Sequence, residues 1–241
     1  MHTTIRSKSY LFVTIAVLIH GCAYFNTFYN ARQYYEEAEK LRLEKDGESI
    51  PITAMDKYGK TITKCKKVID EFPDSKFVIE AHLLMAKARY YRSDYDLAII
   101  DLNTVQSEGK GKNVEESRYW RALCKWKKGS VRAALDELNE LLDNSTTRGI
   151  QSKCYLSLAE IAKESKDIDL SISHLQKAAK LTVERDEKGV IYGRLSEMAF
   201  NRQDYELAKD GYNNVISHSL SKEKIENAHL QILKILAKII C

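Results

Sequence analysis

The sequence predicts an all-α fold, an α-solenoid in which about five helical hairpins are stacked and closed by one capping helix. Three observations support this prediction. Only two prolines occur among 241 residues, and the ten glycines are scattered, so the composition favours long helices. Compact side chains recur every 36 or 37 residues between positions 86 and 208. The last segment, Lys222–Ile240, is apolar except for one narrow polar stripe.

The repeat is clearest in two columns of compact residues. The columns run 12 positions apart, and each advances by 36, 37 and 37 residues. The first contains Ala86, Ala122, Ala159 and Ser196, and the second contains Ala98, Ala134, Ser171 and Ala208. Antiparallel helices approach closely only where the facing side chains are small, so each pair marks the predicted crossing of two helices in one hairpin. The column of large residues that should fill the space between hairpins is Leu102, Leu138, Leu175 and Tyr212.

Segments before and after these repeats extend the pattern. Asn26–Lys45 is expected to form the first helix, followed by a loop over Asp46–Thr53. The buried columns of its partner helix are Tyr58, Thr61, Cys65 and Val68. At the other end, the capping helix should turn its polar stripe toward solvent. That stripe consists of Asn227, Gln231, Lys234 and Lys238.

These spacings resemble the tetratricopeptide repeat (TPR), a helical hairpin of 34 residues with small residues at its eighth and twentieth positions. The resemblance covers residues 53–240, although the repeats are two or three residues longer here. The aromatic residue usual at the eleventh position is replaced by Arg89, Lys125, Ala162 and Ala199. The resemblance implies a right-handed superhelix that binds other proteins and performs no catalysis.

TPR proteins usually bind peptides or helices in a concave groove lined by the first helix of each hairpin. The groove positions carried over from this resemblance are Leu83, Lys87, Tyr90, Tyr91, Tyr119, Leu123, Trp126 and Lys127. Later repeats contribute Glu160, Lys163, Glu164, Glu197, Phe200 and Asn201. The groove should be aromatic and basic near its start and more acidic later, which suits a partner segment with acidic ends. The alternative places Tyr90 and Trp126 in the core between repeats.

The first 21 residues resemble a bacterial lipoprotein signal peptide. Two basic residues precede the apolar run Leu11–Ile19, which is shorter than the roughly 20 residues of a permanent membrane span. An aliphatic residue and Gly21 then precede Cys22 as in the lipobox, with His20 as a departure from the usual pattern. The resemblance implies cleavage before Cys22, which would carry diacylglycerol and an N-acyl chain such as palmitate. The alternative is an ordinary secretory signal with an incidental cysteine.

The predicted signal also indicates a location. Cys22 is followed by Ala23 and not by the aspartate that retains lipoproteins at the inner membrane, so the resemblance favours the outer membrane, facing the periplasm. The helical region begins about four residues later, and an extended link of that length reaches about 14 Å. The aromatic residues in this region are Tyr24, Phe25, Phe28 and Tyr29. They are expected to pack on the first repeat, with contact to lipid headgroups as the alternative.

A narrower resemblance concerns residues 71–99, which read EFPDSKFVIEAHLLMAKARYYRSDYDLAI. They are similar to the TPR lipoproteins of the outer-membrane β-barrel assembly machinery (BamD-like). The resemblance implies a non-enzymatic scaffold that binds other envelope proteins; the alternatives are a Tol–Pal coordinator and a secretin pilotin. The predicted organisation is a signal peptide at 1–21, a lipidated N-terminus with the first helix at 22–52, repeats at 53–220 and a capping helix at 221–241.

No motif in the sequence favours catalysis. The formal charge of +4, less the two basic residues of the signal, is +2 and is dispersed, which argues against nucleic acid as a partner. A loose match to a phosphate-binding loop, Ala54–Thr61, falls inside a predicted helix, so we expect no nucleotide. The cysteine spacing fits no zinc site, and we expect no metal or cofactor apart from the lipid. Cys65, Cys124 and Cys154 should be buried and Cys241 exposed.

Overall fold

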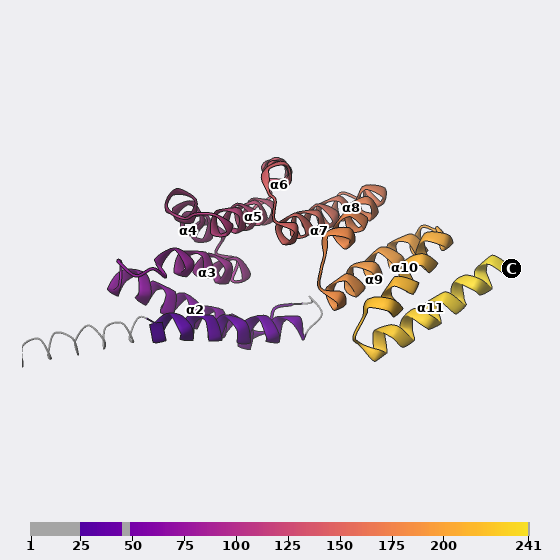
Figure 1. Cartoon of the computed structure of the whole chain (residues 1–241), viewed down its shortest axis with the longest axis horizontal. Helices are drawn as coiled ribbons and strands as arrows, with labels where there is room; N and C mark the ends of the chain where they lie inside the picture. Colours follow the sequence, from indigo (N-terminus) through magenta and orange to yellow (C-terminus); the bar gives the residue numbers. More distant parts are fainter. Residues whose placement is uncertain (1–24, 45–48, 241) are drawn as a thin grey trace, which may run out of the picture. The chain divides into compact units, whose positions relative to one another are not determined.

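The computed structural model describes residues 25–44 and 49–240, and every regular element in these ranges is a helix (Figure 1). The predicted signal peptide, Cys22, Ala23, Tyr24 and Cys241 lie outside the described residues, as do positions 46–48 of the predicted loop. The first helix occupies residues 25–43. The others are α2 (Ile52–Glu71), α3 (Val78–Tyr91), α4 (Tyr95–Glu108), α5 (Lys112–Lys127), α6 (Val131–Asn144), α7 (Arg148–Glu164), α8 (Ile168–Leu181), α9 (Arg185–Asn201), α10 (Tyr205–His218) and α11 (Lys222–Ile240).

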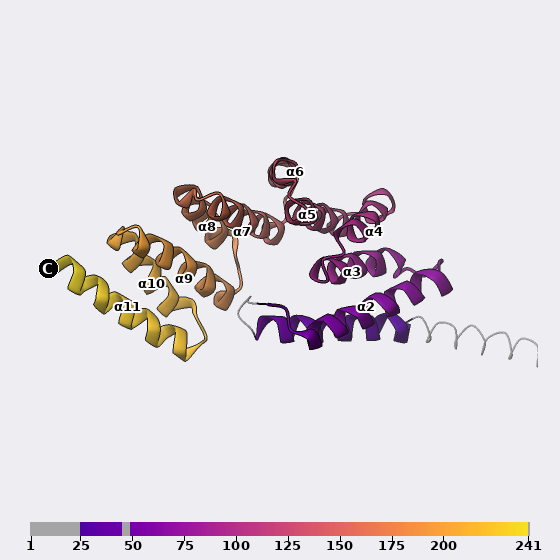
Figure 2. The same cartoon turned by 180° about the vertical axis from the view of Figure 1, so that it is seen from behind.

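The helices group into two compact units. Unit 1 is Met1–Gly129 and contains the helices up to α5, and unit 2 is Ser130–Cys241 and contains α6 to α11. Consecutive helices are packed neighbours: α2, α3, α4 and α5 follow one another in unit 1, and α6 to α11 do so in unit 2. Helices α9, α10 and α11 lie side by side in both views (Figures 1 and 2). The predicted all-α stack of helical hairpins is confirmed within each unit.

The two columns of compact residues lie in the interior. All eight of these side chains are at most 1% exposed. In the α7–α8 hairpin the hydroxyl of Ser171 donates to the carbonyl of Ala159 at 2.8 Å, so the two columns meet directly. In the α9–α10 hairpin Gly211 lies so near Ser196 that a Cβ atom on it would be 2.1 Å from the Ser196 Oγ. Small side chains therefore set the helix crossings, as the spacing predicts.

The turns after α3, α5, α7 and α9 each contain one residue in the left-handed region. These residues are Ser93, Gly129, Lys166 and Gln203, with φ of 64°, 85°, 63° and 63°. They follow the last residues of their first helices and repeat at the same 36- and 37-residue spacing. The next amide bonds back to the helix, as from Asp167 to Ala162 O and from Asp204 to Ala199 O. This is a Schellman ending, a position that favours glycine, although three of the four residues are not glycine.

Arg89 replaces the aromatic residue that TPRs usually have at this position, and a buried ion pair explains the exchange. Its guanidinium contacts the carboxylate of Asp101 on α4, whose side chain is buried, and also donates to the Leu97 carbonyl at 3.2 Å. The Nδ1 atom of His82 lies 3.1 Å from the other Asp101 oxygen. The α3–α4 hairpin is therefore closed by charge as well as by its compact pair.

The polar stripe of α11 is largely turned to solvent, as expected, because Asn227, Lys234 and Lys238 are exposed and Gln231 is half-buried. Asn227 and Gln231 line a hollow shared with α9 and α10, whereas leucines of α11 remain exposed. The buried side chains of the helix are Ala228 and Ile235, which pack with residues of α9 and α10. Asn227 is one position from Ala228, and Gln231 is four positions from Ile235. Both polar residues therefore lie at the edge of the buried face of the helix.

The described cysteines are free and buried, as the sequence predicts. They are Cys65, Cys124 and Cys154. Burial raises the pKa of the Cys65 thiol well above its usual range and that of Cys154 to about 12. Both thiols therefore remain protonated and unreactive at neutral pH. None of the described helices combines the length and the apolar character needed to cross a membrane.

Candidate partner groove

Three helices of unit 1 surround a common hollow, and each is the first helix of its repeat. They are the helix at residues 25–43, α3 and α5. On the first helix, Phe28, Arg32 and Tyr35 follow one another at helical spacing and face it. On α3 the lining residues are Glu80, Leu83, Leu84 and Lys87, and on α5 they are Asn113 and Glu116. Residues three and four apart share one helix face, so each helix presents a single stripe to the hollow. Because α2 and α4 are the second helices of their hairpins, they contribute no lining residue.

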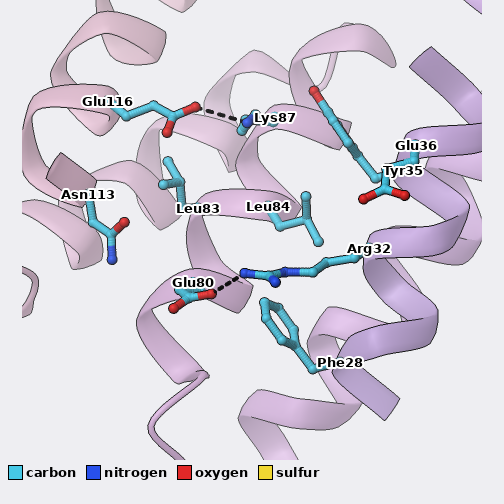
Figure 3. A pocket seen from close by; sticks show the side chains of 10 residues that line it. All are labelled: Phe28, Arg32, Tyr35, Glu36, Glu80, Leu83, Leu84, Lys87, Asn113 and Glu116. Carbon is cyan, nitrogen blue, oxygen red and sulfur yellow. Dashed lines mark hydrogen bonds and ion pairs between the residues drawn. The ribbon is translucent and has the colours of Figure 1, made fainter. Parts of the chain in front are cut away.

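The hollow has a volume of about 520 Å³ and an apolar floor with charged walls (Figure 3). Phe28 is buried and stacks on Phe77, with ring centroids 4.9 Å apart. Leu83 is also buried, and Leu84 is half-buried beside it. A hollow of this size takes a few side chains of a partner and is too small and open to enclose a whole helix.

Two ion pairs connect the walls of the hollow. Figure 3 shows Arg32 reaching from the first helix to Glu80 on α3, where nitrogen and oxygen are 2.6 Å apart. Lys87 on α3 lies 2.9 Å from Glu116 on α5. The Arg32 pair is substantially exposed, whereas the Lys87 pair is more buried and so is less screened by salt.

Lys87 also contacts aromatic rings on both neighbouring helices. Its ammonium lies 5.3 Å from the ring centre of Tyr35 and 5.7 Å from that of Trp120, within cation–π range. Glu116 in turn accepts from the Trp120 indole nitrogen at 3.3 Å. One ammonium therefore contacts the first helix and α5 from its own position on α3.

An aromatic cluster lies deeper, beneath the charged wall. Tyr58 and Tyr91 are stacked with centroids 5.0 Å apart, and Tyr90 meets the edge of Trp120 at 5.2 Å. Burial raises the pKa of Tyr58, Tyr90 and Tyr91 well above the usual range, so these phenols remain neutral. Arg42 lies over the Tyr91 ring at 4.5 Å. The cluster holds the first helix, α2, α3 and α5 together by contacts that are geometrically specific.

The groove residues predicted from the sequence separate into three groups. Leu83 and Lys87 line the hollow. Tyr90 and Tyr91 belong to the aromatic cluster, and Tyr119 and Leu123 are buried. Trp126 is half-buried with the Lys127 ammonium 3.9 Å from its ring centre, and neither residue lines the hollow. The interpretation of Tyr90 as core between repeats, kept open at the sequence level, fits its surroundings better than a groove position.

Several lining residues were not identified from the sequence. They are Phe28, Arg32, Tyr35, Glu36, Glu80, Leu84, Asn113 and Glu116. Four of them belong to the first helix, where the spacing 28, 32, 35 and 36 is a usable signal. The expected basic character of this region also differs from the structure, because Arg32 and Lys87 are each paired with a glutamate.

The aromatic residues near the predicted lipid attachment point divide between two environments. Phe28 packs on the first hairpin, as expected. Phe25 and Tyr29 stack on each other at 6.5 Å but remain 57% and 51% exposed. The expectation of packing therefore applies to Phe28 and only in part to its neighbours.

A second hollow of about 440 Å³ lies in unit 2 between α9, α10 and α11. Three of the later predicted groove residues, Glu197, Phe200 and Asn201, line it. Arg194 also lines it and lies 3.3 Å from Glu160, so the predicted acidic character is again offset by a nearby cation. Lys163 and Glu164 are exposed and are not among its lining residues.

The segment that loosely matches a phosphate-binding loop has a different conformation. Ala54–Thr61 lies inside α2, and its Tyr58 and Thr61 side chains are buried. A phosphate cradle requires a glycine-rich turn between a strand and a helix, which a continuous helix cannot form. Among the described residues, no group of three or more histidine, cysteine or acidic side chains could hold a metal ion.

Comparison with known proteins gives similarity at the level of the fold. No family model matches the sequence, and no curated protein matches it. A thermophilic TPR protein of Thermus thermophilus aligns with a TM-score of 0.53 and 12% identity, over 86% of this chain and 99% of that one. A TPR protein from Parabacteroides merdae aligns with a TM-score of 0.48 and 11% identity, over 87% of this chain and 74% of that one. The fold is a TPR-type helical solenoid.

Proposed function

We propose that the chain is a lipid-anchored, non-enzymatic TPR scaffold that holds a segment of another envelope protein in the unit 1 groove. The observation that carries this proposal is the hollow between three first helices, with its apolar floor and its two ion pairs. Such a surface offers hydrophobic burial together with directional polar contacts, the combination found in peptide grooves. The proposal concerns protein binding, which the TPR-type fold supports.

The partner segment that fits is short and mixed in character. An apolar side chain would enter against Leu83 and Leu84, where contact with solvent would be lost. Charged residues on either side would meet Glu36 on the first helix or the Arg32–Glu80 pair, which connects the first helix to α3. The sequence alone favours a partner segment with acidic ends. Such a segment fits less well here, because Arg32 and Lys87 already pair with Glu80 and Glu116.

The membrane anchor is proposed from the lipobox-like sequence before Cys22. The described part of the first helix begins at residue 25, three positions after Cys22, so it is close in sequence to the proposed anchor. Phe25 and Tyr29 are exposed at this end of the helix, where aromatic side chains favour the headgroup layer. This arrangement supports an outer-membrane lipoprotein that faces the periplasm, with unit 1 next to the lipid.

The more specific proposal is a BamD-like role in outer-membrane protein assembly. It is supported by the similarity of residues 71–99 to those lipoproteins, a segment that contributes Glu80, Leu83, Leu84 and Lys87 to the groove. A Tol–Pal coordinator and a secretin pilotin are the other candidates. These three roles differ in the protein that would occupy the groove.

The anchor is tested by labelling cells with radioactive palmitate. The Cys22→Ser variant should lose the label completely and remain uncleaved, whereas the Cys241→Ser control should keep it. Helical circular dichroism should be the same in both, because neither substitution falls within the described residues of a helix. A Cys22→Ser protein that is still labelled would contradict lipidation at this position.

The groove is tested by photo-crosslinking in vivo from two adjacent residues. Glu36 lines the hollow, whereas Glu37 points to α2 and pairs with Lys57. A photoreactive phenylalanine at position 36 should crosslink a specific envelope protein, and the same group at position 37 should not. Capture of the barrel-bearing assembly protein supports the BamD-like role, while capture of a Tol–Pal component or a secretin favours an alternative. Equal crosslinking from both positions would contradict a groove-based site.

A further inference from the structure

The hollow in unit 2 differs from the unit 1 hollow at one position of the repeat. Gly193 on α9 lines it, and the equivalent residues of the three preceding repeats are Leu83, Tyr119 and Leu156. Leu83 belongs to the apolar floor of the unit 1 hollow, and Tyr119 is buried. A glycine therefore stands in unit 2 where each of these repeats has a large side chain.

Packing within unit 2 does not require a glycine at position 193. A Cβ atom there would meet the Val215 Cγ2 atom at 3.8 Å, which is an ordinary contact. Gly189, one turn earlier, is different, because a Cβ atom on it would be 2.9 Å from the Ser219 nitrogen. A glycine inside a helix costs about 1 kcal/mol relative to alanine. In return, Gly193 leaves open space over the backbone of α9, inside the hollow.

Apolar side chains border this open space. Val190 lies three positions before Gly193 on the same side of α9, and the Val215 side chain of α10 lies next to it. Val215 and Ala228 of α11 are buried, and Val190 is half-buried. An apolar side chain of an occupant would take the place of the absent side chain at position 193 and lose its contact with water.

Several polar groups of the unit 2 hollow have no partner among the described residues. Tyr212 is only 8% exposed and lines the hollow, yet its hydroxyl forms no hydrogen bond with any described residue. The side chains of Asn201 on α9 and Lys224 on α11 likewise have no partner in the described ranges. Buried hydroxyls in proteins nearly always have a hydrogen-bond partner, so an acceptor on an occupant would satisfy Tyr212. In the unit 1 hollow, by contrast, both cations are paired with glutamates.

The amide side chains indicate the conformation of the occupant. Asn201 lies on α9, and Asn227 and Gln231 lie on α11. One long hydrogen bond of 3.4 Å joins Asn227 and Gln231, so the other polar atoms of both amides remain available. An amide side chain donates and accepts, as does a polypeptide main chain. A helix uses its main-chain groups internally, so an extended segment matches this lining better than a helix.

The charged residues that line the hollow are two cations and one acid. Arg194 and Glu197 lie on α9, and Lys224 lies on α11. Arg194 is 3.3 Å from Glu160, whereas Lys224 has no ion-pair partner among the described residues. The cation that remains available to an occupant is therefore on the α11 side.

The other charged residues at the start of α11 do not occupy Lys224. Lys222 and Glu226 pair with each other at 3.6 Å, and neither lines the hollow. Glu223 is exposed and is not a lining residue either. A carboxylate on the occupant is the group that complements Lys224.

We propose that the unit 2 hollow is a second recognition site, which binds an extended segment of another protein with one bulky apolar residue close to an acidic residue. The apolar side chain occupies the space over Gly193. The main chain bonds to the amides of α9 and α11 and to the Tyr212 hydroxyl, and the carboxylate pairs with Lys224. The site depends neither on the groove proposed for unit 1 nor on the lipid anchor.

The site is tested with random seven-residue peptides displayed on phage and selected on the purified full chain. Selected peptides should share a bulky apolar residue within two positions of an aspartate or glutamate. Gly193→Leu fills the hollow and should weaken a selected peptide by about tenfold or more in fluorescence polarisation. The control Gly149→Leu adds the same side chain at an exposed glycine of α7 and should not change binding. A selection without the motif, or one that yields only peptides insensitive to Gly193→Leu, would overturn the proposal.

Two further variants separate recognition from packing. Tyr212→Phe removes a hydroxyl that has no hydrogen bond in the described chain, so the unfolding midpoint should not fall while peptide affinity falls about fivefold. Tyr205→Phe, on the same helix but outside the hollow, is the control and should not change affinity. Lys224→Gln should remove the preference for an acidic residue over its amide in the peptide. Unchanged affinity in Tyr212→Phe, or a preference that survives Lys224→Gln, would contradict the assigned contacts.

Discussion

Unit 1 and unit 2 close the same kind of hairpin with different chemistry. In unit 1 the α3–α4 hairpin contains the buried Arg89–Asp101 pair, and aromatic rings fill the space between helices. In unit 2 the α7–α8 hairpin uses the Ser171 hydroxyl on the Ala159 carbonyl, with aliphatic residues around it. The backbone repeat tolerates either solution because only the compact crossing is required of it. Unit 1, where charged and aromatic residues close the hairpin, also has the hollow with more charged lining residues.

The helix starts differ between the units as well. Asp167 and Asp204 in unit 2 cap α8 and α10 by accepting from Leu170 N and Leu207 N at 3.0 Å and 3.2 Å. Asp94 precedes α4 in the same position of unit 1 but makes no such cap. Local backbone capping thus contributes more to the hairpins of unit 2, and long-range side-chain contacts contribute more to that of unit 1.

The largest expected effect comes from removing the buried acid of unit 1. Asp101→Ala leaves Arg89 and His82 without their carboxylate and should destabilise unit 1 by about 3 kcal/mol. Hydrogen exchange measured by mass spectrometry should show lost protection in α3 and α4 but not in α7 and α8. Asp96→Ala, which removes a carboxylate that is 79% exposed, is the control and should change little. Equal losses in both units would contradict their separation.

A pair of glycines tests the close approach of α9 and α10 in unit 2. Gly211→Ala would place a Cβ 2.1 Å from the Ser196 Oγ and 3.2 Å from its Cβ, so it should destabilise unit 2 by about 2 kcal/mol. Gly193→Ala meets nothing nearer than 3.8 Å and should instead stabilise α9 by about 1 kcal/mol. Urea unfolding followed by circular dichroism measures both. The same sign for the two substitutions would refute the assigned contact.

Substitutions at the left-handed turn residues should change stability in opposite directions, depending on whether glycine is introduced or removed. Lys166 and Gln203 have a positive φ, which is unfavourable for a residue with a side chain. Lys166→Gly and Gln203→Gly remove this strain, and each should add about 1 kcal/mol of stability. Gly129→Ala should remove a similar amount, since φ is 85° there. Thermal unfolding midpoints provide the comparison. A loss of stability in Lys166→Gly would indicate that the lysine side chain has a contact of its own.

The smallest expected effect is a pH dependence that belongs to unit 2. Burial lowers the pKa of His174, and Lys177 lowers it further. The folded state therefore binds this proton less readily than the unfolded state, so stability is lost as pH falls below about 6.5 toward the folded value. His174→Gln should flatten this part of the unfolding profile, and the exposed His229→Gln should not. A steeper profile in His174→Gln would reverse the assigned sign.

The sequence allowed prediction of the helices because their crossings are fixed by residue size. Ala159 and Ser171 meet as their spacing requires, and the large column lies in the interior. Partners that come from other helices could not be predicted in this way. Periodicity indicates which side of α3 is buried, but it does not show that Glu116 neutralises Lys87 or that Asp101 binds Arg89. The contact of Tyr90 with Trp120 on α5 is another partner that periodicity does not show, and it agrees with the core alternative for Tyr90.

Lys87 has a further consequence for how the groove would respond to an occupant. Its ammonium contacts Tyr35, Trp120 and Glu116 at once, so it is both a potential ligand contact and a tie between neighbouring helices. A guest that recruits this cation must first withdraw it from those contacts. Recognition would then cost some internal rigidity, and a mutation that loosens the tie should change the rates of capture and release together.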